Sequence, residues 1–162
     1  MNRNFLAFLI VSVLLFSGCG NNAQKTSIDG VPTNPAEAMK MARTSSCTAN
    51  MKKMGSGLAI LISDDSGQTY RTLSTVNGSA LWDTLASIDK TGCLDASTVK
   101  CPVTGKTYRG PINSSKVGWM SNAGDVVAMC EGCGNVLYGR GELYNWPKDS
   151  KDFQEALSAT TR

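Results

Sequence analysis

The stretch that decides the fold is residues 47–61, which read CTANMKKMGSGLAIL. Its larger apolar side chains recur at intervals of four, three, four and three residues. They are Cys47, Met51, Met54, Leu58 and Leu61. This spacing lines them up along one side of an α-helix. With Pro35 in its first turn and Asn34 as its cap, the sequence predicts a long amphipathic helix over residues 35–63.

The rest of the chain predicts an antiparallel sheet for this helix to cover. A shorter helix is expected over residues 79–88, and a final amphipathic turn or two over residues 151–157. Between them lie short β-like runs broken by Gly and Asn, at residues 107–109, 117–120, 126–130, 136–138 and 143–146. Gly55 and Gly57 weaken the long helix, which indicates close packing against the sheet. The expected fold class is α+β, with the long helix laid across an antiparallel sheet.

The first residues have the layout of an export signal. Arg3 precedes an apolar run over residues 5–16, and Ser17, Gly18 and Cys19 follow it. As a helix this run would be only about 18 Å long, which is short for a transmembrane span. The junction resembles the lipobox of bacterial lipoproteins, which implies that Cys19 carries a diacylglycerol thioether and is N-acylated. The predicted organisation is a signal peptide at 1–18, a polar tether at 19–34 and one domain at 35–162.

Composition excludes several classes of function. The chain has 16 Lys and Arg against 13 Asp and Glu, and the signal removes only Arg3, which leaves 15 − 13 = +2. A charge this near neutral predicts no nucleic-acid binding. The chain has no His, which rules out Ser-His-Asp and Cys-His catalysis. No complete catalytic set and no cofactor motif is present, so the sequence predicts a protein that is not an enzyme.

Six cysteines are the one excess in the composition, and five of them remain after Cys19 is assigned to the lipid. Exported thiols meet an oxidising compartment, so all five are disulfide candidates, and one must stay unpaired within the chain. They are Cys47, Cys93, Cys101, Cys130 and Cys133. A bridge from Cys47 to Cys101 is the first expectation, because it would pin the long helix to the sheet region.

Cys130 and Cys133 also admit two sharper interpretations. A redox Cys-x-x-Cys pair should open a helix, whereas this pair lies between two predicted strands. As half of a zinc site, the pair needs two more ligands, and Cys93 and Cys101 are the predicted ones. The residues after Cys101 have the Pro and Gly of a zinc knuckle but lack its second Cys. Disulfides are the preferred expectation, with the zinc set and the redox pair as alternatives.

Three segments in order resemble the soluble head of type II secretion pseudopilins and related pilin-like proteins. They are residues 42–55 (ARTSSCTANMKKMG), the Lys-Cys-Pro at 100–102 with Tyr108, and residues 134–143 (GNVLYGRGEL), which are similar to the family's closing hairpin. The resemblance implies a pilin-like head. The family's long apolar filament helix is replaced here by the lipobox and polar tether, so the chain combines a pilin-like head with a lipid anchor.

The expected function is therefore a non-enzymatic lipoprotein with a structural or protein-interaction role at the cell envelope. The membrane, through the lipid on Cys19, is the one partner that the sequence names, and a protein partner is also expected. In a cell with two membranes, Gly20 after the lipidated residue predicts sorting to the outer membrane, on its periplasmic or surface face. The alternatives are a true pseudopilin of a secretion or pilus-like system and a cell-surface zinc-binding or thiol-redox module.

Overall fold

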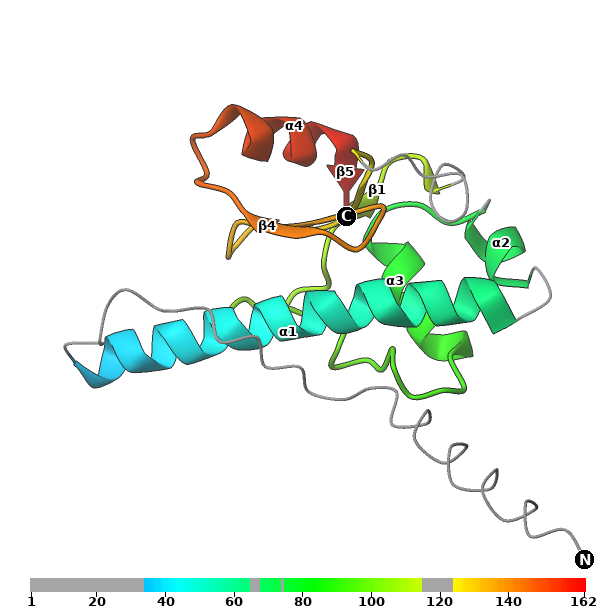
Figure 1. Cartoon of the computed structure of the whole chain (residues 1–162), viewed down its shortest axis with the longest axis horizontal. Helices are drawn as coiled ribbons and strands as arrows, with labels where there is room; N and C mark the ends of the chain where they lie inside the picture. Colours follow the sequence, from blue (N-terminus) through cyan, green and yellow to red (C-terminus); the bar gives the residue numbers. More distant parts are fainter. Residues whose placement is uncertain (1–33, 65–67, 74, 115–123) are drawn as a thin grey trace, which may run out of the picture. The chain divides into compact units, whose positions relative to one another are not determined.

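The computed structural model describes residues 34–64, 68–73, 75–114 and 124–162. In chain order the elements are α1 (Pro35–Asp64), α2 (Gln68–Leu73), α3 (Ser79–Ile88), β1 (Gly110–Pro111), β2 (Val126–Cys130), β3 (Asn135–Tyr138), β4 (Leu143–Asn145), α4 (Lys151–Ala159) and β5 (Thr160–Thr161) (Figure 1). The predicted signal peptide, most of the tether, Cys19 and the expected strand at 117–120 lie outside the described residues. Among the described helices, α1 included, there is no candidate for a membrane span.

Helix α1 begins and ends where the sequence places it. The side-chain oxygen of Asn34 accepts a hydrogen bond from the Glu37 amide at 2.9 Å, so Asn34 caps the helix and Pro35 occupies its first turn. All five members of the predicted apolar stripe are buried, at Cys47, Met51, Met54, Leu58 and Leu61. The spacing in the sequence therefore identified the side of α1 that faces the core.

A three-stranded antiparallel sheet in the order β2-β3-β4 lies between α1 and α4 (Figure 1). Leu137 of β3 packs in the cluster that contains the α1 stripe. On the other face, Met129 and Val136 pack with Phe153 and Ala156 of α4. The mixed helix and sheet content and the antiparallel pairing confirm the α+β class.

The chain ends in a second small sheet that the sequence did not predict. Strands β1 and β5 pair antiparallel, with Gly110 opposite Thr161 and Pro111 opposite Thr160. The strand expected over residues 107–109 is replaced by two isolated bridges, Lys100 with Thr107 and Arg109 with Met129. This region is therefore a set of short pairings, and it leaves the segment around Cys101 as a loop.

The two glycines of α1 approach different neighbours. A Cβ added to Gly55 would lie 3.4 Å from Leu137 Cδ1 of β3, which is ordinary contact with the predicted sheet. A Cβ on Gly57 would lie 2.7 Å from Leu94 Cγ, a buried side chain in the loop after α3. Close packing is thus found at Gly57, but against a loop.

These contacts predict opposite outcomes for one substitution at two positions. Gly57→Ala should lower the free energy of unfolding by about 1–2 kcal/mol, because overlap with Leu94 outweighs the gain of about 1 kcal/mol in helix propensity. Gly55→Ala keeps the propensity gain without the overlap, so it should be neutral or stabilising by up to about 1 kcal/mol. Urea unfolding of both variants measures the difference. A Gly57→Ala variant as stable as Gly55→Ala would contradict the packing described here.

Candidate metal centre

Two loops of the same construction carry three of the cysteines. We call residues 101–105 the first knuckle and residues 130–134 the second knuckle. Each begins with Cys, at Cys101 or Cys130, and has Gly four residues later. The amide of that Gly donates to the carbonyl of the Cys, at 2.7 Å from Gly105 and at 2.9 Å from Gly134. The two loops therefore fold back in the same way and turn their leading thiols toward a shared space.

Glycine is required at the end of the second knuckle. Gly134 has a φ of +78°, in the left-handed region that side chains disfavour, and a Cβ there would lie 2.5 Å from the carbonyl oxygen of Trp146. Gly105 has the matching φ of +68°. The two glycines therefore allow both turns to adopt this conformation.

The knuckles differ in the number of thiols that they carry. The second knuckle has Cys133 immediately before its glycine, whereas the first has Thr104 at the equivalent place. The fourth thiol comes instead from Cys47 of α1, and all three segments meet. The side-chain amide of Asn50, one turn further along α1, donates to the carbonyls of Ser97 and Lys100 at 3.3 and 3.2 Å. These bonds fix α1 beside the start of the first knuckle.

The four sulfurs form a compact group, which we call the thiol cluster. Its members are Cys47, Cys101, Cys130 and Cys133, and their Sγ atoms all lie within 4.8 Å of one another. Cys101 Sγ and Cys133 Sγ are 3.6 Å apart. Four sulfurs arranged tetrahedrally around zinc, at about 2.3 Å each, would be about 3.8 Å from one another. The cluster is therefore close to the size of a tetrathiolate metal site.

Polar groups around Cys47 favour its thiolate. Tyr108 Oη and Asn135 Nδ2 donate to Cys47 Sγ at 3.5 and 3.3 Å. A hydrogen bond from the Cys130 thiol is the main cause that lowers the pKa of Cys47 to about 6, with Tyr108 and Asn135 adding to it against the opposing effect of burial. The cluster is thus built to hold negative charge on sulfur, as a metal ligand requires.

The environments of Cys130 and Cys133 favour their protonated forms. Burial, with the negative charge of Cys47, raises the pKa of Cys133 to about 12. The hydrogen bond to Cys47 and then burial raise the pKa of Cys130. A divalent ion would displace these protons, because it supplies the positive charge that four neighbouring thiolates need.

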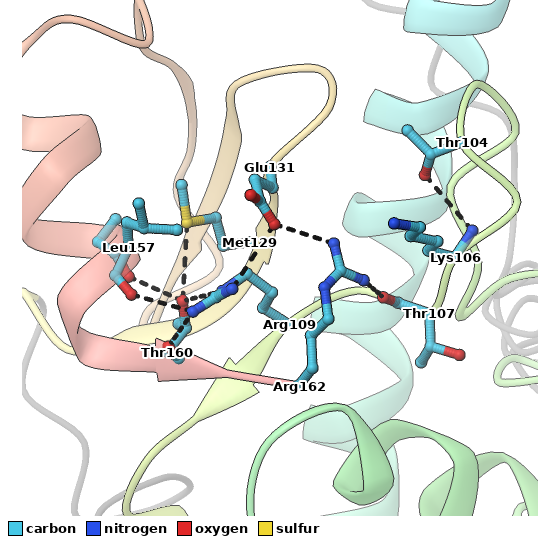
Figure 2. Close-up of polar contacts among 10 residues, drawn as sticks. Thr104, Lys106, Thr107, Arg109, Met129, Glu131, Leu157, Thr160 and Arg162 are labelled. Atoms are coloured by element: carbon cyan, nitrogen blue, oxygen red, sulfur yellow. Dashed lines mark hydrogen bonds and ion pairs between the residues drawn. The ribbon is translucent and has the colours of Figure 1, made fainter.

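The second knuckle is also tied to the end of the chain. Glu131 lies between Cys130 and Cys133 of this knuckle. Its carboxylate accepts a hydrogen bond from Arg162 at 2.9 Å and forms an ion pair with Arg109 at 3.6 Å (Figure 2). The hydrogen bond from Arg162 is the main cause that lowers the pKa of the Glu131 carboxyl. Arg109 in turn donates to the carbonyls of Leu157 and Thr160. These contacts tie the second knuckle to Arg109 and to the last residues of the chain.

The predicted site residues divide into two groups in the structure. Cys101, Cys130 and Cys133 of the predicted zinc set come together, but the fourth position is taken by Cys47 and not by Cys93. Cys93 is buried outside the thiol cluster, next to Gly57 of α1. A Cβ added to Gly57 would lie 3.3 Å from the Cβ of Cys93. The four cysteines of the thiol cluster are free thiols, so the expected disulfide from Cys47 to Cys101 is not formed here. The pair Cys130 and Cys133 lies between β2 and β3, as expected, and not at the start of a helix.

Four thiols can supply all four positions of a tetrahedral site. Structural zinc sites are closed in this way, whereas catalytic zinc sites keep one open position. The arrangement can bind a soft divalent ion and cross-link α1, the first knuckle and the second knuckle.

Comparison with known proteins gives no family for this chain. No family model matches the sequence, and no curated protein and no solved structure is significantly similar to it. The pseudopilin resemblance therefore stays a prediction from the three sequence segments.

Proposed function

We propose that the protein is a non-enzymatic, lipid-anchored component of the cell envelope, with a head domain that is held together by one zinc ion in the thiol cluster. One observation carries the zinc site, and the lipobox-like sequence before Cys19 carries the anchor. The four Sγ atoms lie within 4.8 Å of one another, although they come from three separate segments of the chain.

Metal binding accounts for this geometry better than a pair of disulfides does. A disulfide joins sulfurs two by two at about 2.05 Å, whereas these four are mutually close. Tetrahedral all-sulfur sites in proteins hold zinc or iron. The two knuckles, each closed by an amide-to-carbonyl bond at a glycine, support the zinc site further. A redox pair would need the thiol of Cys130 or Cys133 at the start of a helix.

The ion would act on structure by cross-linking. Cys47 belongs to α1, Cys101 to a loop and Cys130 to the end of β2. These elements share a core cluster with Met51, Met54 and Leu137, so the ion would add a covalent-like link within a core that is already apolar. The zinc then stabilises the head that the lipid on Cys19 presents at the membrane.

The pilin-like part of the proposal rests on the order of elements. A long helix that lies on an antiparallel sheet is what the resemblance implies, and α1 on the β2-β3-β4 sheet agrees with it. The first turns of α1, up to Ser46, are mostly exposed and lead back toward the tether. This exposed helix surface supports a head that offers its surface to another protein.

Metal content of matched cysteine variants tests the zinc site. The full mature lipoprotein, purified in detergent under reducing conditions, should contain about one zinc per chain by elemental mass spectrometry. Cys47→Ser should lose most of this zinc, because one of four ligands is removed. Cys93→Ser should retain it, because Cys93 is buried but lies outside the thiol cluster.

The same pair of variants identifies the ligand set. Retention of zinc by Cys47→Ser together with its loss from Cys93→Ser would favour the set expected from the sequence over the one proposed here. Iron in place of zinc would keep the tetrathiolate site and change the identity of its ion. A purified chain without any bound metal would overturn the proposal.

A further inference from the structure

The thiols of the cluster are unequally protected from solvent. Cys47, Cys101 and Cys130 are 0%, 2% and 3% exposed, whereas Cys133 is only partly buried. Cys133 is therefore the residue of the cluster that an oxidant from solvent reaches most readily. This matters because metal-bound thiolates remain nucleophilic toward disulfides.

One sulfur within contact distance of Cys133 belongs to the other knuckle. Cys101 Sγ lies 3.6 Å away, and a disulfide requires about 2.05 Å, so the two sulfurs need to approach by about 1.5 Å. The two knuckles are already in contact, because a Cβ on Gly132 would clash with Thr104 Cγ2. Both thiols lie in the loops of the two knuckles, outside the helices and strands.

Cys47 is poorly placed to take part. It is fully buried on α1, and its sulfur accepts hydrogen bonds from Tyr108 and Asn135. The part of its helix that follows Cys47 is held by the apolar stripe and by the bonds from Asn50. Cys47 can therefore stay in position while the knuckles rearrange.

We propose that oxidation by a small-molecule or protein disulfide releases the metal ion and leaves a Cys101–Cys133 disulfide in its place. This inference rests on the proposed zinc site and concerns its regulation. An exported protein would meet such disulfide oxidants in its own compartment. The two states of the centre would then be a zinc-linked form and a disulfide-linked form.

The chemistry balances with one disulfide molecule per zinc ion. The thiolate of Cys133 attacks one sulfur of the oxidant, forms a mixed disulfide and expels the other half as a thiolate. The thiolate of Cys101 then attacks the Cys133 sulfur and expels the second half as another thiolate. The protein loses two electrons, the oxidant gains them, and the zinc ion, left with Cys47 and Cys130 as its only thiolate ligands, dissociates.

Treatment of the zinc-loaded full chain with glutathione disulfide tests this inference. We expect one zinc released to a chromogenic chelator per chain, two glutathione molecules formed, and one disulfide that peptide mapping assigns to Cys101 and Cys133. Brief treatment should trap glutathione on Cys133. Cys93→Ser should give the same stoichiometry, and dithiothreitol with added zinc should restore the starting form.

Two results would overturn the inference and leave the zinc site intact. One is a chain that keeps its zinc at a glutathione disulfide concentration that fully oxidises a control peptide with two free thiols. The other is zinc release with the disulfide or the trapped glutathione at Cys47 or Cys93. A reduced chain that binds no zinc at all would overturn both proposals, and it is recognised before any oxidant is added.

Discussion

Removal of the metal by a strong zinc chelator is expected to lower the melting temperature of the head by about 15 °C. An ion that binds only the folded state stabilises it by about 4 kcal/mol at a thousandfold excess over its dissociation constant. For a domain of this size, each kcal/mol corresponds to about 4 °C. The effect is large because Cys47, Cys101 and Cys130 belong to the main core cluster, so the ion links elements at the centre of the domain.

Thermal unfolding followed by circular dichroism, under reducing conditions, measures this change. Zinc added back to the chelated protein should restore the original melting temperature, whereas magnesium should not, because it prefers oxygen ligands. The control is Cys47→Ser, which should melt near the chelated wild type and respond little to either ion. Equal melting temperatures with and without chelator would show that no ion holds the three segments together.

Replacement of Cys19 by Ser is expected to move the protein almost completely from the membrane fraction to the soluble or secreted fraction. Two or three acyl chains hold a protein firmly, whereas the apolar run at 5–16 is too short for a stable span. Without the lipidated Cys the signal should also be processed differently, so the mass of the exported chain should change. Fractionation and intact mass measure the two effects.

Ser17→Ala serves as the matched control for the anchor, because it keeps a small residue beside the cleavage point and leaves Cys19 in place. It should stay in the membrane fraction with lipidated Cys19 as its first residue. A Cys19→Ser protein that remains at the membrane with an unchanged mass would instead support a retained apolar helix, as in a true pseudopilin.

The elements with a strong period were predictable from the sequence, and the short ones were not. Helix α1, helix α3 and strands β2 to β4 lie within a few residues of their predicted ranges, because each contains a repeated apolar pattern. Strands β1 and β5 have two residues each, and they exist only because Gly110 meets Thr161 far along the chain. Helix α2 has six residues, which is too short to show a pattern of its own.

The candidate site was predictable as far as local spacing reached. The second knuckle was visible as Cys130 and Cys133, and the first knuckle as Cys101 with its Pro and Gly. The first knuckle has Thr104 where the second has Cys133, so the fourth thiol must come from a distant part of the chain. The spacing of the cysteines could not show which one it is. Cys47 fitted the apolar stripe of a helix so well that it read as a core position and a disulfide partner. A buried cysteine in a core stripe and a metal ligand have the same signature until the tertiary structure brings sulfurs together.

The unequal construction of the two knuckles has a consequence for the order of assembly. The second knuckle supplies two ligands on its own and the first supplies one, so the hairpin and the loop can offer only three thiols. The fourth arrives only when α1 docks, across the 101 − 47 = 54 positions that separate Cys47 from Cys101. Closing a loop of that size is a non-local event. In the proposed site, binding of the ion by all four thiols would therefore report that α1 has docked on the rest of the head.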